Sequence, residues 1–370
     1  MTFQRTAVRQ NLKILARPRQ SAQRAGLAGP PVDGLFDLDS YSHDVPEDLI
    51  AQYPCPDRDQ ARLMVLDRSA QTIRHGVFAD IGQYLAPKTV FVVNNSKVIP
   101  ARLLGRKART GGEVEVFLLQ PLADGYSFEA LLKPLKKIRE GERVDFGLGI
   151  SAVLTDKEKR IVRFNVKNVI RRLKDVGHVP LPPYIKRSDE SLDRDYYQNV
   201  YAKRLGSVAS PTAGLHFTSQ RMRRLRAKGH GFLELTLHIN YGTFKPVETP
   251  DIRRHPMHEE TYAVGAPVHA ALLKAKAAGR PVAAVGTTSC RVMESVAATG
   301  MLKGTTDLFI YPGYRFKIAD ILLTNFHLPY STLLMLVCAF GGYDLVQRAY
   351  AEAIRERYRF YSYGDAMLIL

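Results

Sequence analysis

Two histidines in the second half of the chain stand beside glycines and small residues, where an imidazole could act on a bound ligand. His216 lies in Ser207–Thr218, whose small residues let a backbone approach a ligand closely. His238 ends the alternating stretch Leu233–His238, and the ends of strands are where open α/β sheets place their ligands. The alternative for both segments is structural: a tight turn with a satisfied histidine, and a strand followed by an ordinary loop.

The segment His255–Glu260 is the densest group of titratable side chains. It holds two histidines three residues apart and two carboxylates, which could bind a metal. Pro256 interrupts the helical spacing that would put both histidines on one face, and no further ligand cluster accompanies them. We therefore expect acid–base chemistry or hydrogen bonding from His258 or Glu259 rather than a metal site. An exposed polar loop is the plainer alternative.

A strand, a glycine turn and a helix follow one another in Val285–Glu294. Backbone N–H groups and the hydroxyls of Thr287, Thr288 and Ser289 at a helix start suit a carboxylate or a phosphate. Arg291 could pair with a carboxylate through two hydrogen bonds. The glycine spacing fits neither a Walker motif nor a dinucleotide fingerprint. Alternatively, the hydroxyls only cap the helix.

Two further junctions combine aromatic residues with polar ones. Phe309–Phe316 is expected to form a strand and a Pro-Gly turn, followed by aromatics and Arg315, which suits a stacked base or a cation held over a ring. A buried hairpin is the structural alternative. Thr324–Thr332 follows a predicted strand and precedes a helix that Ser331 or Thr332 would cap. Several polar junctions of this kind in one half of a chain favour a shared cleft.

Periodicity predicts an α/β fold with an inserted barrel. Strands are expected at Leu63–Asp67, Val90–Val93, Leu233–His238, Val282–Val285, Leu308–Ile310 and Ile321–Leu323. Helices are expected at Val169–Val176, Ser219–Ala227, Ala266–Ala278, Ser289–Ala298, Leu333–Phe340 and Leu345–Arg357. Between them, six short strands without a helix predict a small barrel or sandwich: Arg102–Gly105, Glu113–Leu119, Ser127–Leu132, Arg143–Phe146, Ile150–Leu154 and Arg160–Phe164.

These elements divide the chain into three parts. Residues 36–98 and 168–370 form a large layered α/β domain, and residues 99–167 form a small antiparallel β-barrel inserted into it. Residues 1–35 are rich in Arg and poor in acidic residues, so we expect a flexible basic extension.

Composition narrows the class of protein. The 370 residues carry 53 Lys plus Arg against 36 Asp plus Glu, a formal net charge of +17, which favours a polyanionic partner. A generic basic surface kept for solubility is the alternative, and charge alone does not separate the two. Three scattered cysteines, Cys55, Cys290 and Cys338, argue against a disulfide framework or a thiolate metal site. No apolar run is long enough to span a membrane. A reducing cytoplasm fits these features.

Ten ordered segments resemble the S-adenosylmethionine:tRNA ribosyltransferase-isomerase family of queuosine biosynthesis, over about residues 36–370. They are Leu49–Arg58, Val93–Leu103, Val179–Ile185, Ala209–Phe217, Thr236–His238 with Gly242–Phe244, Met257–Glu259, Val285–Ser289, Ile310–Tyr314, Asn325–Pro329 and Tyr358–Met367. The sequence departs from the family at Ile239–Tyr241, where Tyr241 would narrow a pocket, at Ser210, and in a shorter 295–307 stretch.

The resemblance implies a reaction and its partners. The family transfers the ribosyl unit of S-adenosylmethionine to 7-aminomethyl-7-deazaguanine at the tRNA wobble position, and releases adenine and methionine. S-adenosylmethionine is a co-substrate, so no bound cofactor and no metal is expected. The resemblance also implies a monomer, an α/β domain with an inserted β-barrel, and a tRNA partner in the cytoplasm. The alternatives are a non-catalytic RNA-binding module and another S-adenosylmethionine enzyme, such as a methyltransferase.

With this reaction in view, site roles can be assigned as hypotheses. The base and the acid come from His216, His238, His258 and Glu259. The residues expected to bind S-adenosylmethionine are Thr212, Gly214, Gly242, Thr243, Thr287, Thr288, Ser289, Arg291, Tyr311, Phe326 and His327. Those expected to contact tRNA are Arg58, Asn95, Lys97, Arg102, Tyr314 and Arg315.

Overall fold

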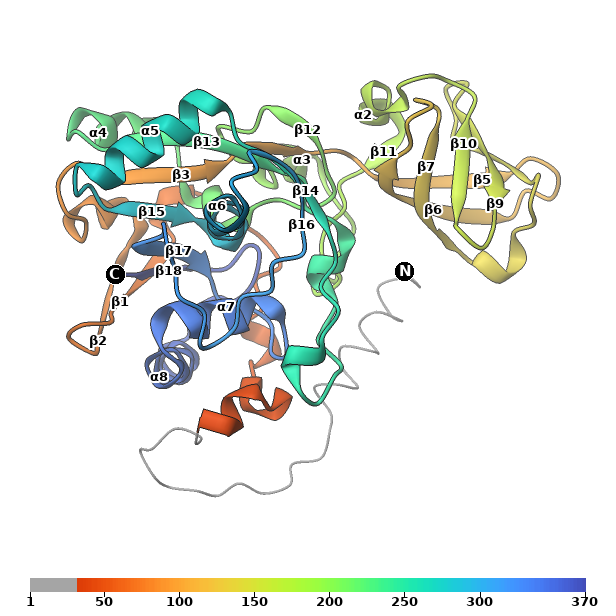
Figure 1. Ribbon diagram of the computed structural model, residues 1–370. Coiled ribbons are helices and arrows are strands. Elements are labelled where there is room, and N and C mark those ends of the chain that lie inside the picture. Colours follow the sequence, from red (N-terminus) through yellow and green to blue (C-terminus); the bar gives the residue numbers. More distant parts are fainter. Residues whose placement is uncertain (1–31) are drawn as a thin grey trace.

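A nine-stranded mixed sheet forms the centre of the larger part of the molecule (Figure 1). The structure is a computed structural model and describes residues 32–370. The strands lie in the order β16 (Lys303–Thr306), β14 (Glu260–Ala263), β13 (Gly231–Leu237), β3 (Val90–Asn94), β15 (Val282–Val285), β17 (Ile321–Asn325), β18 (Ala366–Ile369), β1 (Arg62–Asp67) and β2 (Thr72–Val77). Strands β13, β3, β15 and β17 are parallel, so their carboxyl ends meet at one edge.

Helices cover both faces of this sheet. Strand β3 is buried along its whole length, and its side chains alternate between two cores: Val92 points to one, and Phe91 and Val93 point to the other. The Val92 face packs against α5 (Ala266–Ala277), α6 (Gly286–Thr299), α7 (Thr332–Gly341) and α8 (Tyr343–Arg355). The opposite face packs against α4 (Ser219–Ala227). The result is a three-layered α/β arrangement.

Local sequence signals account for the helix ends. The Thr218 hydroxyl accepts a hydrogen bond from Arg221 N at 3.0 Å and caps α4. The Ser331 hydroxyl does the same for α7, from Leu334 N at 3.2 Å. Helix α6 stops at Gly300, whose φ of 72° is a left-handed conformation that glycine adopts without strain.

A closed antiparallel barrel forms the second part of the molecule (Figure 1). Its strands are β5 (Arg102–Lys107), β6 (Glu113–Pro121), β7 (Ser127–Lys133), β10 (Ile161–Phe164), β9 (Ser151–Asp156) and β8 (Arg143–Asp145). Pairing of β8 with β5 closes the ring, which removes the exposed sheet edges. The barrel encloses its own apolar core, in which Phe128 and Phe164 are 5.8 Å apart between ring centroids.

Short elements join the two parts. Strand β11 (Gly177–His178) extends the barrel sheet beside β5, and β4 (Ser96–Val98) pairs with β12 (Arg204–Ser207). Helices α2 (Leu173–Val176) and α3 (Ser191–Tyr196) lie in the same connecting region. Tyr241, which follows β13, contacts Phe117 of β6 with ring centroids 5.5 Å apart. The barrel therefore supports a loop that leaves the large sheet.

The predicted fold class is confirmed: a layered α/β part carries an inserted antiparallel barrel. All six barrel strands were predicted in their places, and α4 has the predicted bounds. The predicted division into 36–98, 99–167 and 168–370 stays a prediction. Of the predicted N-terminal extension, residues 1–31 lie outside the described residues. Within residues 32–370 no helix is both long enough and apolar enough to cross a membrane.

Several element predictions were wrong or incomplete. No strand forms at Leu308–Ile310; the strand is β16, five residues earlier, and the Leu308 carbonyl instead accepts a hydrogen bond from Arg291. Helix α6 begins at Gly286, three residues before the predicted start, and Val169–Val176 is a 3-10 turn followed by the short α2. Sequence analysis missed the short strands β2, β4, β11, β12, β14 and β18.

Candidate active site

A pocket opens at the carboxyl ends of the parallel strands, where α/β sheets bind their ligands. Segments that follow β12, β13, β15 and β17 all contribute to it. The residues lining this main pocket are Tyr184, Ala209–Ala213, Ile239, Thr243, Lys245, Pro246, Gly286–Thr288, Thr324–Pro329, Ser331, Leu333, Tyr361 and Ser362. Its empty space of about 980 Å³, open solvent at the mouth included, suits a ligand of cofactor size.

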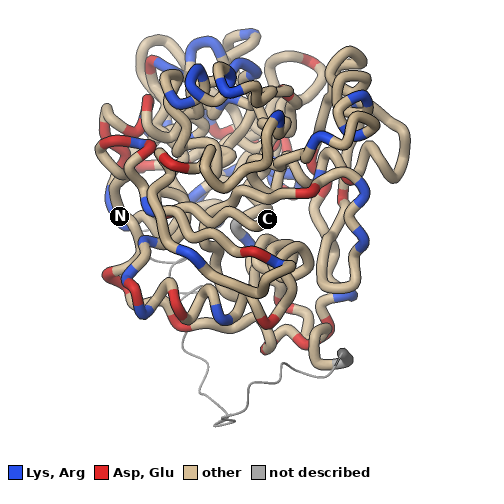
Figure 2. Tube along the Cα trace, turned by 90° about the vertical axis from the view of Figure 1, so that its left-hand side faces the viewer, with Lys and Arg blue, Asp and Glu red and all other residues tan. Residues whose placement is uncertain are grey.

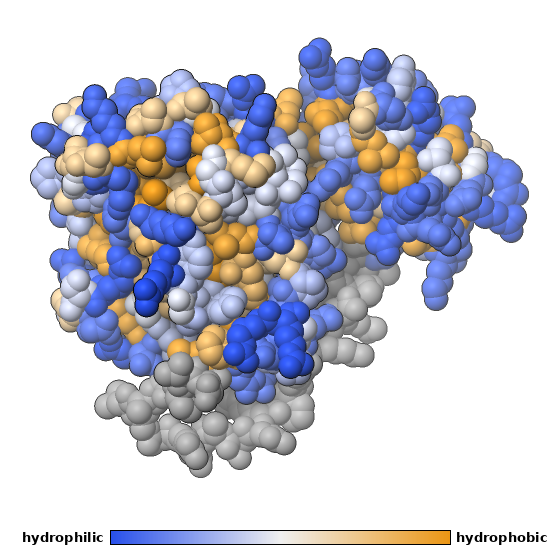
Figure 3. Space-filling view, viewed as in Figure 1, coloured by the Kyte–Doolittle hydropathy of each residue, from blue (hydrophilic) through white to orange (hydrophobic). Residues whose placement is uncertain are grey.

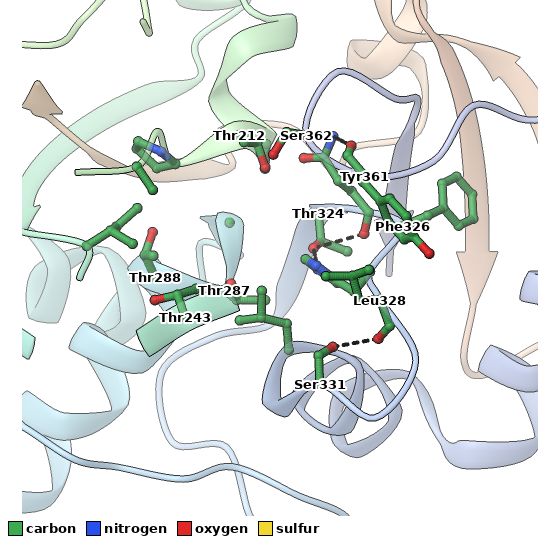
Figure 4. A pocket seen from close by; sticks show the side chains of 18 of the residues that line it. Thr212, Thr243, Thr287, Thr288, Thr324, Phe326, Leu328, Ser331, Tyr361 and Ser362 are labelled. Atoms are coloured by element: carbon green, nitrogen blue, oxygen red, sulfur yellow. Dashed lines mark hydrogen bonds between the residues drawn. The ribbon is translucent and has the colours of Figure 1, made fainter. Parts of the chain in front are cut away.

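Three threonines lie across the main pocket from two aromatic residues (Figure 4). Thr243, Thr287 and Thr288 lie on one side, and Phe326 and Tyr361 on the other. This arrangement offers hydrogen bonds to one end of a ligand and flat apolar surfaces to the other end.

The backbone of Tyr361 is strained. Its φ of 70° is rare for a bulky residue, and the surrounding hydrogen bonds hold it there. Tyr361 N donates to Phe326 O at 3.1 Å, and Asn325 Nδ2 donates to Tyr361 O at 3.2 Å. Strained residues of this kind cluster at ligand sites, and Tyr361 lines the main pocket.

His327 is the histidine that lines the main pocket, and its surroundings keep it neutral. Loss of water around the ring lowers the pKa of His327 to about 3, and the nearby His43 lowers it further in the same direction. Its Nε2 lies 2.7 Å from the Thr324 hydroxyl, and its backbone N–H donates to the Tyr350 hydroxyl at 2.8 Å. At neutral pH, His327 therefore presents an uncharged imidazole to a ligand.

His216 lies behind the main pocket in a small hollow that shares Ser362 with it. Burial lowers the pKa of His216 to about 3, so the ring is neutral. Its ring packs at a tilt against Phe78 with centroids 5.3 Å apart, and its Nε2 is 3.4 Å from Asn325 Nδ2. These contacts match the structural alternative for His216, although its catalytic role stays untested.

A second hollow adjoins the main pocket and shares Thr243, Lys245 and Leu333 with it; we call it the basic hollow. Its lining residues are Asn240, Gly242, Thr243, Lys245, His255, Met257, His258, Glu260, Arg291, Thr332 and Leu333. Three predicted site residues, Gly242, His258 and Arg291, meet here rather than in the main pocket.

Glu260 is a site residue that sequence analysis missed. It is 3% exposed and pairs with the guanidinium of Arg291 through Nη1. Its other oxygen, Oε1, accepts hydrogen bonds from the Thr243 hydroxyl at 3.0 Å and from Asn240 N at 3.3 Å. The neighbouring Glu259 is exposed and lines none of these hollows. The buried carboxylate beside the pocket is thus Glu260, one residue from the predicted one.

Arg291, predicted to bind a carboxylate of the ligand, has protein partners for its guanidinium. Besides Glu260, its guanidinium donates to Leu308 O at 3.0 Å, and its Nη2 lies 3.4 Å from Thr306 O. The side chain is 5% exposed. The buried carboxylate of Glu260 neutralises Arg291. The predicted role of Arg291 in binding a ligand stays a prediction.

The other residues predicted to bind S-adenosylmethionine fall into two groups, those that line the main pocket and those that do not. Thr212, Thr243, Thr287, Thr288, Phe326 and His327 line the main pocket. Gly214, Ser289 and Tyr311 do not. A Cβ on Gly214 would lie 1.9 Å from the Tyr201 hydroxyl, so this glycine permits close packing.

His238 is half-buried against Gly206, and burial lowers its pKa. Tyr241 packs on the barrel and does not line the main pocket, in contrast to the prediction that it narrows it.

The residues predicted to contact tRNA fall into two groups, exposed side chains and side chains that have protein partners. Lys97 and Arg315 are exposed. Arg58 donates to the carbonyls of Asp195, Gln198 and Leu215 at 2.7, 2.9 and 3.2 Å. The remaining three also have protein partners: Asn95 contacts Glu234 and Thr236, Arg102 contacts Glu115, and Tyr314 contacts Glu294.

Positive charge lies on several surfaces of the molecule. Lys and Arg gather at the top of the view in Figure 2, where α4 carries Arg221, Arg223, Arg224 and Arg226. Hydrophilic side chains also cover much of the visible barrel surface in Figure 3. Within residues 32–370 no group of three or more His, Cys, Asp or Glu side chains is placed to hold a metal ion.

An α/β protein with a partly enclosed pocket at its strand ends, neutral histidines around it and a basic surface has the features of an enzyme that acts on a nucleic acid. Comparison with known proteins gives the family. The chain belongs to the queuosine biosynthesis protein family, whose model matches residues 38–369.

Relatives and a solved structure agree with this assignment. Over 90% of this chain and 99% of the relative, the sequence is 48% identical to S-adenosylmethionine:tRNA ribosyltransferase-isomerase of Sulfurihydrogenibium sp. strain YO3AOP1. Identity and coverage are the same for the enzyme of that name from Symbiobacterium thermophilum. A crystal structure of S-adenosylmethionine tRNA ribosyltransferase from Thermotoga maritima matches 90% of this chain and all of its own, with 37% identity and a TM-score of 0.52.

Proposed function

We propose that this protein is an S-adenosylmethionine:tRNA ribosyltransferase-isomerase. It transfers and isomerises the ribosyl unit of S-adenosylmethionine onto 7-aminomethyl-7-deazaguanine at the tRNA wobble position, and gives epoxyqueuosine-tRNA, adenine and methionine. The observation that carries this proposal is the match of nearly the whole chain to relatives of that name. The main pocket and the excess of basic residues supply the physical requirements.

The reaction needs a proton acceptor and an exit for adenine. The positive sulfur of S-adenosylmethionine makes the adjacent ribose 5′-carbon acidic, so a base can remove a proton there. The site must then assist adenine departure, after which the amine of the modified base attacks the rearranged sugar. The sulfonium itself activates the methionine leaving group, so the chain's residues need to bind, orient and move protons.

We assign the substrate ends from the two sides of the main pocket. Tyr361, which lines the main pocket, offers an aromatic ring to adenine. The ring of Phe326 is fully buried against Tyr350, Tyr358 and Phe360, so it supports this side of the pocket from within the core. Thr287, Thr288 and Thr243 offer hydroxyls to the ribose and the methionine end. The neutral ring of His327 adds no positive charge next to the sulfonium, which would otherwise oppose binding.

The acid and the base are proposed among His216, His238, His258 and Glu259. Of these four, His258 is an exposed side chain that lines the basic hollow, which shares three lining residues with the main pocket. A proton could therefore pass from His258 to water without crossing the apolar core. His216 is the second candidate because its hollow shares Ser362 with the main pocket.

Further parts of the proposal concern partners and setting. A tRNA carrying the 7-aminomethyl-7-deazaguanine base is the acceptor, and exposed Lys97 and Arg315 contact its phosphates. The enzyme acts as a monomer in the cytoplasm. S-adenosylmethionine enters as a co-substrate, without a bound cofactor.

A turnover assay tests the proposal. Purified protein is mixed with S-adenosylmethionine and tRNA carrying the modified base, and free adenine and methionine are followed. Both products appearing only with the modified tRNA would support the reaction. Formation of S-adenosylhomocysteine would show a methyltransferase instead. Binding of tRNA without any turnover would show a binding module.

A further inference from the structure

The carboxylate of the methionine in S-adenosylmethionine needs a positive partner in the site. Arg291 was the sequence-based candidate, but its charge is balanced by the buried Glu260. The side chain of Arg291 is 5% exposed, so moving it toward a ligand would leave Glu260 buried without a partner. Another cation must therefore fill this role.

Lys245 lies where the main pocket and the basic hollow meet. It lines both, and among the described residues that line the main pocket it is the one formally charged side chain. Its side chain is exposed, and within residues 32–370 no hydrogen bond or ion pair holds its ammonium group. The ammonium is thus available to a ligand.

The backbone around Lys245 is fixed even though the side chain is not paired. Lys245 N donates to Gly242 O at 3.0 Å, and Val247 N donates to Tyr330 O at 2.8 Å. Pro246 stands between these two anchors and restricts the backbone further. A lysine on a fixed backbone and a flexible stem is suited to follow a carboxylate at the end of a methionine chain.

The other groups of the basic hollow also favour an anion. His255 brings an imidazole N–H donor. Thr332 and Leu333 begin helix α7, whose first-turn N–H groups carry partial positive charge. Because Glu260 and Arg291 neutralise each other, Lys245 leaves a net positive charge in the hollow.

We propose that the basic hollow is the carboxylate subsite for S-adenosylmethionine and that Lys245 is its cation. This inference rests on the proposed function, because it takes the main pocket to be the adenosyl site. The two spaces share Thr243, Lys245 and Leu333, so one small molecule can reach across both. That continuity favours the carboxylate of the same ligand over a phosphate of the tRNA.

The placement of adenine agrees with this arrangement. Tyr361 lies across the main pocket from Thr243, which the two spaces share (Figure 4). An adenine ring packed on Tyr361 and a carboxylate in the basic hollow hold the two ends of the ligand apart. The sulfonium and the ribose 5′-carbon then lie in the main pocket between these two ends.

Binding of two ligands to the full chain tests the subsite without requiring turnover. Calorimetry would compare S-adenosylmethionine with decarboxylated S-adenosylmethionine, which lacks the carboxylate. We expect Lys245→Gln to weaken S-adenosylmethionine binding about five- to twentyfold, the range for a charge-assisted bond at a half-open site. The same variant should bind the decarboxylated ligand as wild type does. Lys245→Arg should restore most of the loss.

Lys274→Gln is the matched control, because Lys274 is an exposed lysine on α5 that lines neither space. It should leave both affinities unchanged. The inference is overturned if Lys245→Gln binds S-adenosylmethionine as wild type does, if both ligands weaken equally, or if only tRNA affinity falls. A wild-type protein that binds no S-adenosylmethionine would instead contradict the proposed function.

Discussion

The ring of His258 lies directly against Gly242: a Cβ at residue 242 would come within 2.6 Å of His258 Cδ2 and 2.9 Å of Cγ. No other residue type would leave the imidazole in this place. Gly242 and His258 are 16 positions apart in the chain, and both line the basic hollow. The glycine thus sets the position of a proposed acid–base group.

Gly242→Ala should therefore displace His258 while leaving the fold intact. Gly242 does not have a positive φ, and His258 is exposed, so the ring can swing outward at little cost in stability. We expect adenine release to fall at least about tenfold if His258 moves protons. The melting temperature should change by no more than a few degrees.

Gly265→Ala is a fitting control, since a Cβ there would meet its nearest neighbour at an ordinary 3.8 Å. Its turnover should equal that of wild type. Should Gly242→Ala also retain full turnover, His258 would lose its proposed role.

The two adjacent glutamates should respond differently to the same substitution. Glu260→Gln leaves the Arg291 charge buried without its carboxylate, which costs about 3–5 kcal/mol of unfolding free energy. It also weakens the hydrogen bond that holds the Thr243 hydroxyl. Denaturant unfolding should show the loss, and the Km for S-adenosylmethionine should rise. Glu259→Gln should change neither, because its side chain is exposed.

A double variant separates the effect of the unpaired Arg291 charge on stability from the effect of the lost Thr243 partner on the Km. Glu260→Gln combined with Arg291→Met removes both buried charges, and should regain much of the stability lost by Glu260→Gln alone. The Km should stay raised, because Thr243 still lacks its carboxylate partner. Inactive but fully stable Glu259→Gln would instead identify Glu259 as the base.

The sequence predicts the parts of this site that depend on residues close together in the chain better than the parts that depend on distant residues. Local signals predicted two helix caps and one strand from neighbouring residues. The caps are Thr218 and Ser331, and the strand is the one that ends before Gly286. The choice between Glu259 and Glu260 depends on the face that β14 turns inward. Its alternation, with Glu260 and Tyr262 buried, is visible in the sequence but spans only four residues.

Longer-range partners cannot be read from spacing. The carboxylate partner of Arg291 is 31 residues away in the chain, on another strand. Leu308–Ile310 is apolar like a strand, yet it is held as a loop by that same guanidinium and by burial of Ile310. Tyr241 was expected at the pocket, but packing against Phe117 of the inserted barrel takes it away.

Mild acid should destabilise the fold through its buried histidines. Burial lowers the pKa of His216 and His327 to about 3 and that of His43 to about 4, all below the value of about 6.5 in an unfolded chain. Between these values the unfolded chain binds more protons, so stability is complete above about pH 6.5 and falls as the pH drops. At pH 5, each of the three histidines should lower the free energy of unfolding by about 2 kcal/mol.

Urea unfolding at pH 7 and at pH 5 would measure this effect. His43→Gln should reduce the difference between the two free energies of unfolding by about one histidine's share. An equal free energy of unfolding at both pH values would show that the three rings are not held neutral.

Arg58 and Arg315, both predicted to contact tRNA, should prove to have different roles. The guanidinium of Arg58 donates to three backbone carbonyls and stacks over Tyr196 at 4.9 Å. Arg58→Lys keeps the charge but cannot make this set of bonds, so the unfolding free energy should fall by about 1–3 kcal/mol. Affinity for tRNA, measured on the folded protein, should stay close to that of wild type.

Arg315 is exposed, and within residues 32–370 no ion pair holds it. A variant that lacks one phosphate contact releases one fewer counterion when it binds tRNA. Arg315→Gln should therefore weaken tRNA binding at low salt and reduce the slope of log affinity against log salt concentration by about one. Its stability should equal that of wild type, because no hydrogen bond or ion pair from the described part of the chain holds this side chain. If Arg58→Lys flattened the salt plot without loss of stability, the roles would be reversed. The bonds of Arg58 to the backbone would then have to open on tRNA binding, which the three short donor–acceptor distances oppose.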